Sequence, residues 1–190
     1  MNIMAIKRTM LEKGIPAETI EQFVFSESEE ETPEEKIAFA AQMDHLLSRE
    51  QILSVMQEQG CNKNEHTAES VLKFKDKTVE ERIEILNVMN KKHELYSRLN
   101  CDGTLSVSWG YEDKGRYICV CPIMEKLSKS ATVSITFCGC CSGHIKYHFE
   151  QDLEVKLRLI ETVSSPLSSN GEKYCEHRFE IVSSKTDNPQ

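Results

Sequence analysis

Long apolar runs and long basic runs are both absent from this sequence. No stretch approaches the ~20 consecutive apolar residues that cross a bilayer, and the opening MNIMAIKRTMLEKG mixes charges with apolar residues, unlike a signal peptide. The formal net charge is −8 and no basic stretch exceeds a Lys-Lys pair, whereas phosphate backbones are bound by basic stripes. We therefore expect a cytoplasmic protein with no nucleic-acid partner and no membrane partner.

Common catalytic signatures are missing as well. The sequence contains no nucleophile elbow, P-loop, dinucleotide fingerprint or H-E-x-x-H motif. Gly139 and Gly143 do not form a phosphate loop, because no Lys-Ser/Thr pair follows them. Tryptophan occurs once, at Trp109; core packing is its ordinary role, and lining an apolar pocket is the more specific one. Short motifs therefore assign no enzyme class.

The first half of the chain has apolar residues at helical spacing and two capping boxes, in which a threonine hydroxyl and a glutamate three residues later satisfy the first amides of a helix. Helices are expected over residues ~3–13, from Pro16, from TPEEKI (Thr32 with Glu35), from Ser48 to Gly60, near 66–75, and from TVEERI (Thr78 with Glu81).

The second half changes to two-residue alternation, which predicts strands. A hairpin is expected from Leu105, Val107 and Trp109 through YEDKG to Tyr117–Cys121, followed by a strand at 131–137. A short helix should begin at Ser142, with Ile145 and Phe149 in the core. Two further strands are expected, one with Val155, Leu157, Leu159 and Glu161 on one face and a final one at KYCEHRFEIV. This order predicts an α+β fold in which a short helix packs on an antiparallel sheet. We expect a helical region over 1–99, a cysteine-rich α+β region over 100–184 and a tail over 185–190.

Cysteine is the most informative residue type here. The eight cysteines are Cys61, Cys101, Cys119, Cys121, Cys138, Cys140, Cys141 and Cys175. In a reducing cytosol, clustered cysteines bind metal or carry chemistry more often than they form disulfides. Cysteine is also a small buried hydrophobe, and that simpler role is the first interpretation for Cys61 and Cys101.

The segment FCGCCSGH, from Phe137 to His144, has the donors of a zinc site. Thiolate and imidazole suit zinc, which prefers four such ligands in a tetrahedron, and a helix N-terminus favours the thiolate form. On strands, Cys138 and Cys140 would share a face, as would Cys119 and Cys121. The expected ligands are Cys138, Cys141 and Cys175, with Cys140 or His144 as the fourth. Trp109, Cys119, Cys121 and His148 are the residues expected to bind a small ligand.

The stretch from Thr136 to Ile181 resembles the C-terminal half of the 4-vinyl reductase small-molecule-binding domain and its relatives in the L-2-amino-thiazoline-4-carboxylic acid hydrolase-like family. The shared pattern is the cysteine cluster, the segment SGHIKYHFEQDLEVKL, Glu161, and Gly171 followed by Cys175 in GEKYCEHRFEI. The motifs CxCCxGH and SSPLSSNG also occur in similar uncharacterised bacterial proteins. The resemblance covers about a quarter of the chain. It implies a zinc ion held by cysteines beside a buried pocket for a small apolar or aromatic effector.

Two departures from the family pattern leave the family's zinc set incomplete in this chain, so Cys119, Cys121, Cys140 or His144 would have to replace the missing ligand. The family usually has a cysteine shortly after the glutamate of the penultimate strand, where this chain has Val163, Ser164 and Ser165. The family aromatic residue two positions after the last cysteine is His177 here. Some family members dimerise through helices, so the resemblance also implies a homodimer through the helical N-terminal half.

Three hypotheses for function follow. The first is a small-molecule-binding module, or sensor, with a cysteine-built zinc site. The second is a hydrolase of a small cyclic amidine or thio-amidine, with Cys140 or Cys141 as the nucleophile and His144 as the base. The third is a redox protein whose thiols form reversible disulfides. Metal content tests the first hypothesis, and a single alkylation-sensitive cysteine tests the second. A thiol count that changes with reductant tests the third.

Overall fold

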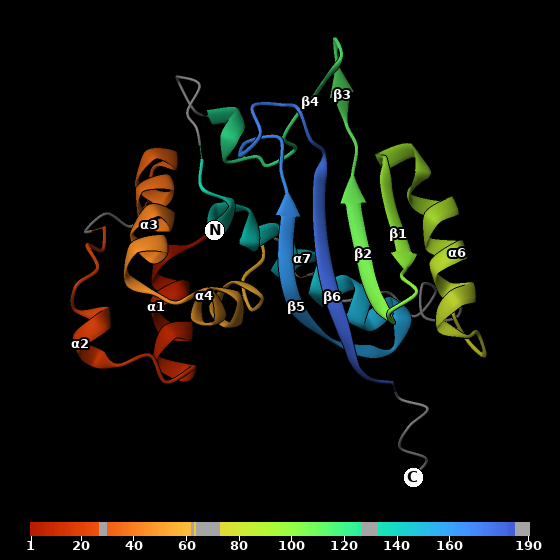
Figure 1. The fold of residues 1–190 in the computed structure, drawn as a ribbon, viewed down its shortest axis with the longest axis horizontal. Coiled ribbons are helices and arrows are strands. Elements are labelled where there is room, and N and C mark those ends of the chain that lie inside the picture. Colours follow the sequence, from red (N-terminus) through yellow and green to blue (C-terminus); the bar gives the residue numbers. More distant parts are fainter. Residues whose placement is uncertain (27–29, 62, 64–72, 127–132, 185–190) are drawn as a thin grey trace.

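The computed structural model describes residues 1–26, 30–61, 63, 73–126 and 133–184. It confirms the predicted α+β fold: helices form the N-terminal half, and an antiparallel sheet with a helix on one face follows. Figure 1 shows α1 to α4 grouped on one side of the sheet, α7 behind the sheet and α6 beside its opposite edge. Among the described helices, none has the length and apolar character needed to cross a membrane.

The N-terminal helices begin where the sequence places their caps. They are α1 (Ile3–Glu12), α2 (Ala17–Ile20), α3 (Pro33–Leu46), α4 (Arg49–Met56) and α6 (Val79–Asn90), followed by a 3₁₀ turn at Lys91–His93. The capping boxes predicted at Thr32 and Thr78 are both present, and Ser48 forms a third with Gln51. The helix predicted near 66–75 lies mostly outside the described residues.

The main sheet has four antiparallel strands in the order β1-β2-β6-β5. They are β1 (Leu95–Leu99), β2 (Thr104–Trp109), β5 (Val155–Ser164) and β6 (Cys175–Ser184), and a separate small hairpin joins β3 (Glu112–Asp113) to β4 (Arg116–Tyr117). The predicted return of 117–121 against β2 is wrong, because β1 and β6 occupy both sides of β2. Strand β1 was not predicted.

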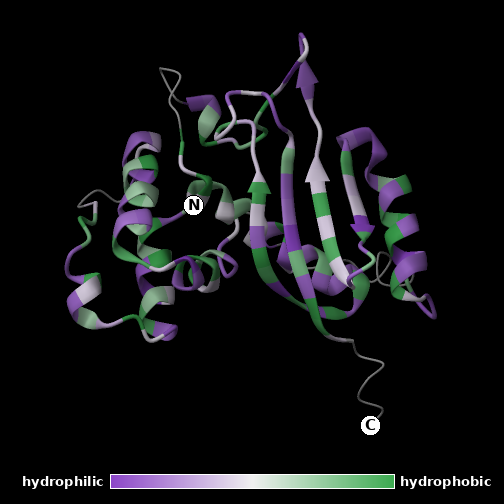
Figure 2. Cartoon of the chain, in the orientation of Figure 1, coloured by the Kyte–Doolittle hydropathy of each residue, from purple (hydrophilic) through white to green (hydrophobic). Residues whose placement is uncertain are grey.

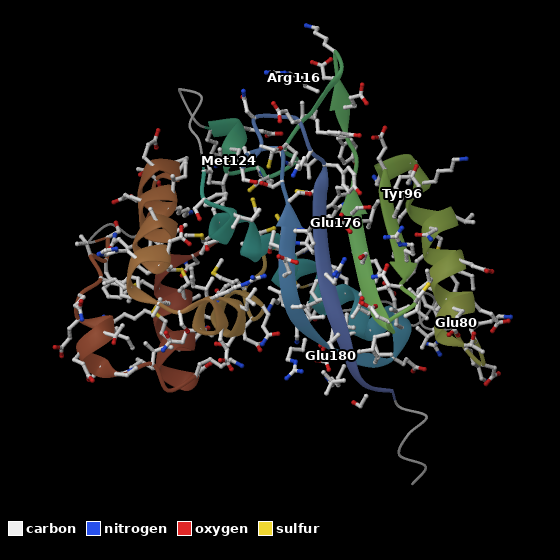
Figure 3. All side chains as sticks on the ribbon, in the orientation of Figure 1. Glu80, Tyr96, Arg116, Met124, Glu176 and Glu180 are labelled. Atoms are coloured by element: carbon white, nitrogen blue, oxygen red, sulfur yellow. The ribbon has the colours of Figure 1, made fainter. Side chains whose placement is uncertain are left out.

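Strand alternation decides which side chains face α7. Cys175, His177 and Phe179 of β6 are buried toward α7, whereas Glu176 and Glu180 lie on the opposite face of the sheet, turned toward the viewer in Figure 3. Figure 2 shows the same alternation as changing hydropathy along the strands. On β5 the prediction that Glu161 shares the face of Leu159 is wrong, because a register shift separates these two residues.

Helix α7 (Ile135–Leu153) joins two groups of buried side chains. Its second half packs on the sheet, where Ile145 and Phe149 are only 2% and 3% exposed, as predicted. Its first half, with Phe137 and Cys138, packs against the N-terminal helices instead. The same helix therefore connects the sheet core to the helical half of the chain.

Candidate functional site: a cavity lined by cysteines

The cysteine cluster lies on a helix, and the strand predicted at 131–137 is wrong for the described residues 133–137. Ser134 is the N-cap of α7, and its hydroxyl accepts a hydrogen bond from the Thr136 amide at 3.1 Å. The Thr136 hydroxyl in turn donates to Asp44 of α3 at 2.5 Å. These polar contacts override the β propensity of the Thr-Val-Ser-Ile-Thr segment. Helix α7 therefore begins seven residues before the predicted start at Ser142.

Two glycines allow α7 to lie against the chain that follows α4. A Cβ atom added at Gly143 would lie 1.9 Å from the Gln59 carbonyl oxygen, and one at Gly139 would lie 2.7 Å from Cβ of Met56. Such distances exclude any larger residue at Gly143 without movement of the backbone. The Gly-x3-Gly pair is therefore a helix-packing seam that presses the cysteine-bearing turns of α7 into the molecule.

Around these turns the structure forms one cavity of about 210 Å³. Its wall contains seven of the eight cysteines, which come from α7, from β6, from the loop after β4 and from the chain after α4. The lining residues are Met1, Cys61, Trp109, Cys119, Val120, Cys121, Pro122, Ile123, Phe137, Cys138, Cys140, Cys141, His144, Leu167 and Cys175. Figure 3 shows sulfur atoms gathered between the start of α7 and the sheet.

Most of the predicted site residues meet at this wall. The proposed metal and catalytic residues Cys138, Cys140, Cys141, Cys175 and His144 all line it, as do the proposed ligand-binding residues Trp109, Cys119 and Cys121. His148 is not among the lining residues and packs against His144, with ring centroids 4.6 Å apart. Cys61 joins the wall, and Cys101 is exposed elsewhere.

Trp109 and a loop close the sheet side of the cavity. The Trp109 ring stacks on His144 at a centroid distance of 6.3 Å. Cys119 and Cys121 lie in the loop after β4, so the expectation that they share a strand face is wrong. Within this loop the Cys121 amide donates a hydrogen bond to the Cys119 sulfur at 3.4 Å, and both cysteines line the cavity.

Burial favours the neutral form of five thiols of the wall. Burial raises the pKa of Cys138 to about 12 and that of Cys119 to about 11, and nearby thiols add to both shifts. Burial likewise raises the pKa values of Cys140, Cys141 and Cys175. A cysteine nucleophile needs a lowered pKa, so these shifts do not support the hydrolase hypothesis at Cys140 or Cys141.

The wall is rich in sulfur but is not arranged as a metal site. Within the described residues, no three His, Cys, Asp or Glu side chains are placed to hold a metal ion. All eight cysteines are free. The expected zinc ion therefore has no ready ligand set in this arrangement, and its ligands would have to rotate and lose their protons before binding.

His177 is a residue of the site region to which the sequence assigned no role. Its side chain is fully buried, and its Nδ1 lies 2.6 Å from the Ser142 hydroxyl, which lies 2.9 Å from the Thr162 hydroxyl. Nε2 of His177 has no hydrogen-bond partner in the described structure, and burial lowers the pKa of the ring to about 3. The signal in the sequence was a histidine at an inward position of β6, between Cys175 and Phe179.

Comparisons with known proteins leave this site without an assigned family. No family model matches the chain, and the search of curated proteins found no similar protein. One similar solved structure is the crystal structure of an H-NOX protein from S. oneidensis in the Fe(II)NO ligation state. It shares 14% sequence identity, with 94% of this chain and 89% of that chain covered, at a TM-score of 0.33. Similarity at that level shows no common function, so the site must be interpreted from its own residues.

Proposed function

We propose that this chain is a small-molecule-binding module whose ligand occupies the cysteine-lined cavity. The observation that carries the proposal is the composition of the wall: among the described residues, no Asp, Glu, Lys or Arg side chain lines it, and the charged group at its edge is the amino terminus of Met1, which contacts Cys140. Ligand pockets are mostly apolar with a few placed polar groups. The resemblance to the 4-vinyl reductase domain supports the same class of function and adds a sensor role.

The volume and the sulfur content of the cavity indicate the kind of ligand. Pockets for drug-sized ligands measure roughly 300–1,000 Å³, and this cavity of about 210 Å³ is smaller. An apolar cavity of about 150 Å³ suffices for benzene. Because sulfur makes favourable contacts with aromatic rings, a ligand with a single aromatic ring fits the wall best.

Titration with toluene tests this proposal. Toluene should shift the NMR signals of cavity residues and raise the melting temperature, because a ligand that binds only the folded state stabilises it. Cys138→Met extends a side chain into the cavity and should weaken toluene binding by at least tenfold. The matched control Cys101→Met changes an exposed cysteine outside the wall and should leave binding unchanged. Equal binding to both variants would defeat the proposal.

Zinc binding by the same thiols is a second candidate, favoured by the meeting of Cys138, Cys141, Cys175 and His144 at one wall. A zinc-loaded protein should contain close to one metal per chain and melt at a lower temperature in chelator, because structural zinc contributes to folding. Cys175→Ser should reproduce the loss, and Cys101→Ser should not. Less than ~0.2 metal per chain after preparation with zinc, with unchanged melting in chelator, would rule zinc out.

A further inference from the structure

A second cleft, separate from the cysteine-lined cavity, lies where the helical half of the chain meets the sheet. Helices α3 and α4 line one side of it, β5 and the loop that follows line the other, and the start of α7 completes the wall. Figure 1 shows α4 beside β5, with α7 behind the sheet. This α4–β5 cleft has a volume of about 560 Å³, within the roughly 300–1,000 Å³ of ligand pockets. It shares no described lining residue with the cavity.

Apolar side chains from every wall line the α4–β5 cleft. Leu47 at the end of α3, Met56 of α4 and Leu159 of β5 all line it, and each is at most 7% exposed. Ile52 and Ile135 line it as well and are partly buried. The cleft therefore offers apolar surface against which the ring of a small molecule can be buried.

Charged side chains lie at the same cleft, and carboxylates outnumber basic groups. Arg49 of α4 donates to Glu161 of β5, with Nη2 and Oε1 2.8 Å apart, so this guanidinium is already paired. The Asp44 carboxylate of α3 accepts a hydrogen bond from the Thr136 hydroxyl at 2.5 Å, and within the described part of the chain it forms no ion pair. Two carboxylates and one guanidinium give the lining a formal charge of −1. A positively charged ligand group is therefore favoured here over a negative one.

We propose that the α4–β5 cleft is a second ligand site, for a small molecule that joins an apolar ring to a protonated amine. The ring lies against Met56, Leu159 and their apolar neighbours, and the ammonium group donates to the Asp44 carboxylate. Thr136 is the positioning residue, since its hydroxyl holds one carboxylate oxygen and leaves the other for the ligand. This inference goes beyond the proposed function and does not depend on a ligand in the cysteine-lined cavity.

NMR titrations with tryptamine and tryptophol test the proposal. The two compounds share an indole ring and a two-carbon arm, and the arm ends in an ammonium group in tryptamine and in a hydroxyl group in tryptophol. At low salt tryptamine should bind about fivefold more tightly, the size of a partly exposed ion pair, and the preference should shrink as salt is added. The shifted amide signals should include those of Thr136 and Thr162, which line the cleft.

Two variants separate the charge of the cleft from its shape. Asp44→Asn keeps the acceptor for Thr136 but removes the charge, so it should abolish the preference for tryptamine and leave tryptophol affinity within about twofold of native. The matched control Glu34→Gln removes an exposed carboxylate of α3 outside the cleft and should keep the preference. Val163→Trp fills the cleft from a position that is 39% exposed and should block both compounds, whereas Val88→Trp, on the exposed side of α6, should block neither.

The outcomes distinguish the ligand class from the site and the site from the cavity. Equal affinity for the two compounds in the native protein, or a preference that survives Asp44→Asn, would overturn the cationic ligand. Failure of both compounds to bind, or binding that is insensitive to Val163→Trp, would overturn the site itself. Cys138→Met, which extends a side chain into the cavity, should leave tryptamine binding unchanged, and loss of binding in that variant would contradict the cleft. Toluene binding in the cavity should be the same with and without Val163→Trp.

Discussion

The two halves of α7 differ in how completely side chains fill the space beside them. From Ile145 to Leu153, large apolar side chains fill the space between helix and sheet, with Ile145, Phe149 and Leu153 each at most 3% exposed. Over the preceding turns, from Cys138 to His144, small residues border a cavity of about 210 Å³. One half is therefore built for stability and the other keeps a space open. The first half is therefore where we place the proposed ligand site.

The largest effect should come from the filled half. Phe149→Ala removes a buried ring from the sheet core and should lower the free energy of unfolding by ~3–5 kcal/mol. Denaturant melts of the native and variant proteins measure the loss. A change within ~0.5 kcal/mol would mean that this half of α7 is not a close-packed core.

The seam between α7 and the chain after α4 should give the next effect. Gly143→Ala forces a methyl group to within 1.9 Å of a carbonyl oxygen, and we expect a loss of about 3 kcal/mol from overpacking. Gly110→Ala is the matched control, because a Cβ atom there meets nothing within 4 Å. If the two variants unfold at the same denaturant concentration, α7 does not contact the chain at Gln59 as described.

Acid should lower the free energy of unfolding through His177, which contacts Ser142 near the middle of α7. Burial lowers the pKa of His177 to about 3, against an ordinary value of 6.5. Below pH ~6.5 His177 is protonated in the unfolded chain but stays neutral in the folded chain, so the free energy of unfolding falls as the pH falls toward 3. Between pH 7 and pH 5 the loss attributable to His177 should be about 2 kcal/mol. His177→Phe should remove this part of the pH dependence, and identical curves for both proteins would contradict it.

The open half should be the least sensitive to truncation. Cys138→Ala removes one sulfur from a wall that already borders empty space, so we expect a loss of about 1 kcal/mol or less. Paired with Phe149→Ala, it compares the open and filled halves of one helix by the same denaturant melts. A loss as large as that of Phe149→Ala would show that the cysteines are close-packed core residues and that the cavity is an unimportant feature.

The sequence predicted the filled half well and the open half poorly. Ile145 and Phe149 are large apolar residues at helical spacing, so their burial could be predicted even though the predicted start of the helix was wrong. The Thr-Val-Ser-Ile-Thr segment has β propensity, and only tertiary contacts such as that of Thr136 with Asp44 make its end helical. The Gly-x3-Gly spacing of Gly139 and Gly143 was visible, yet its meaning depends on the approach of α4.

The sequence predicted which residues meet at the site better than it predicted the elements that carry them. Clustered cysteines near a histidine indicated a common location, and the structure brings seven cysteines and His144 to one wall. The loop position of Cys119 and Cys121 depends on β1 and β6 occupying both sides of β2, which local alternation does not reveal. His177 was given no role because its inward position on the strand does not reveal its hydrogen-bond partner Ser142, which comes from α7.

Ligand binding in the cysteine-lined cavity can be tested directly by soaking crystals of the protein in iodobenzene and locating the iodine by its anomalous scattering. We expect an iodine peak inside the cavity, among Trp109, Phe137, Cys138 and Cys175, and no such peak in Cys138→Met crystals soaked in the same way. Iodine found only at the surface of native crystals, with the cysteine side chains packed against one another where the cavity lies, would contradict it.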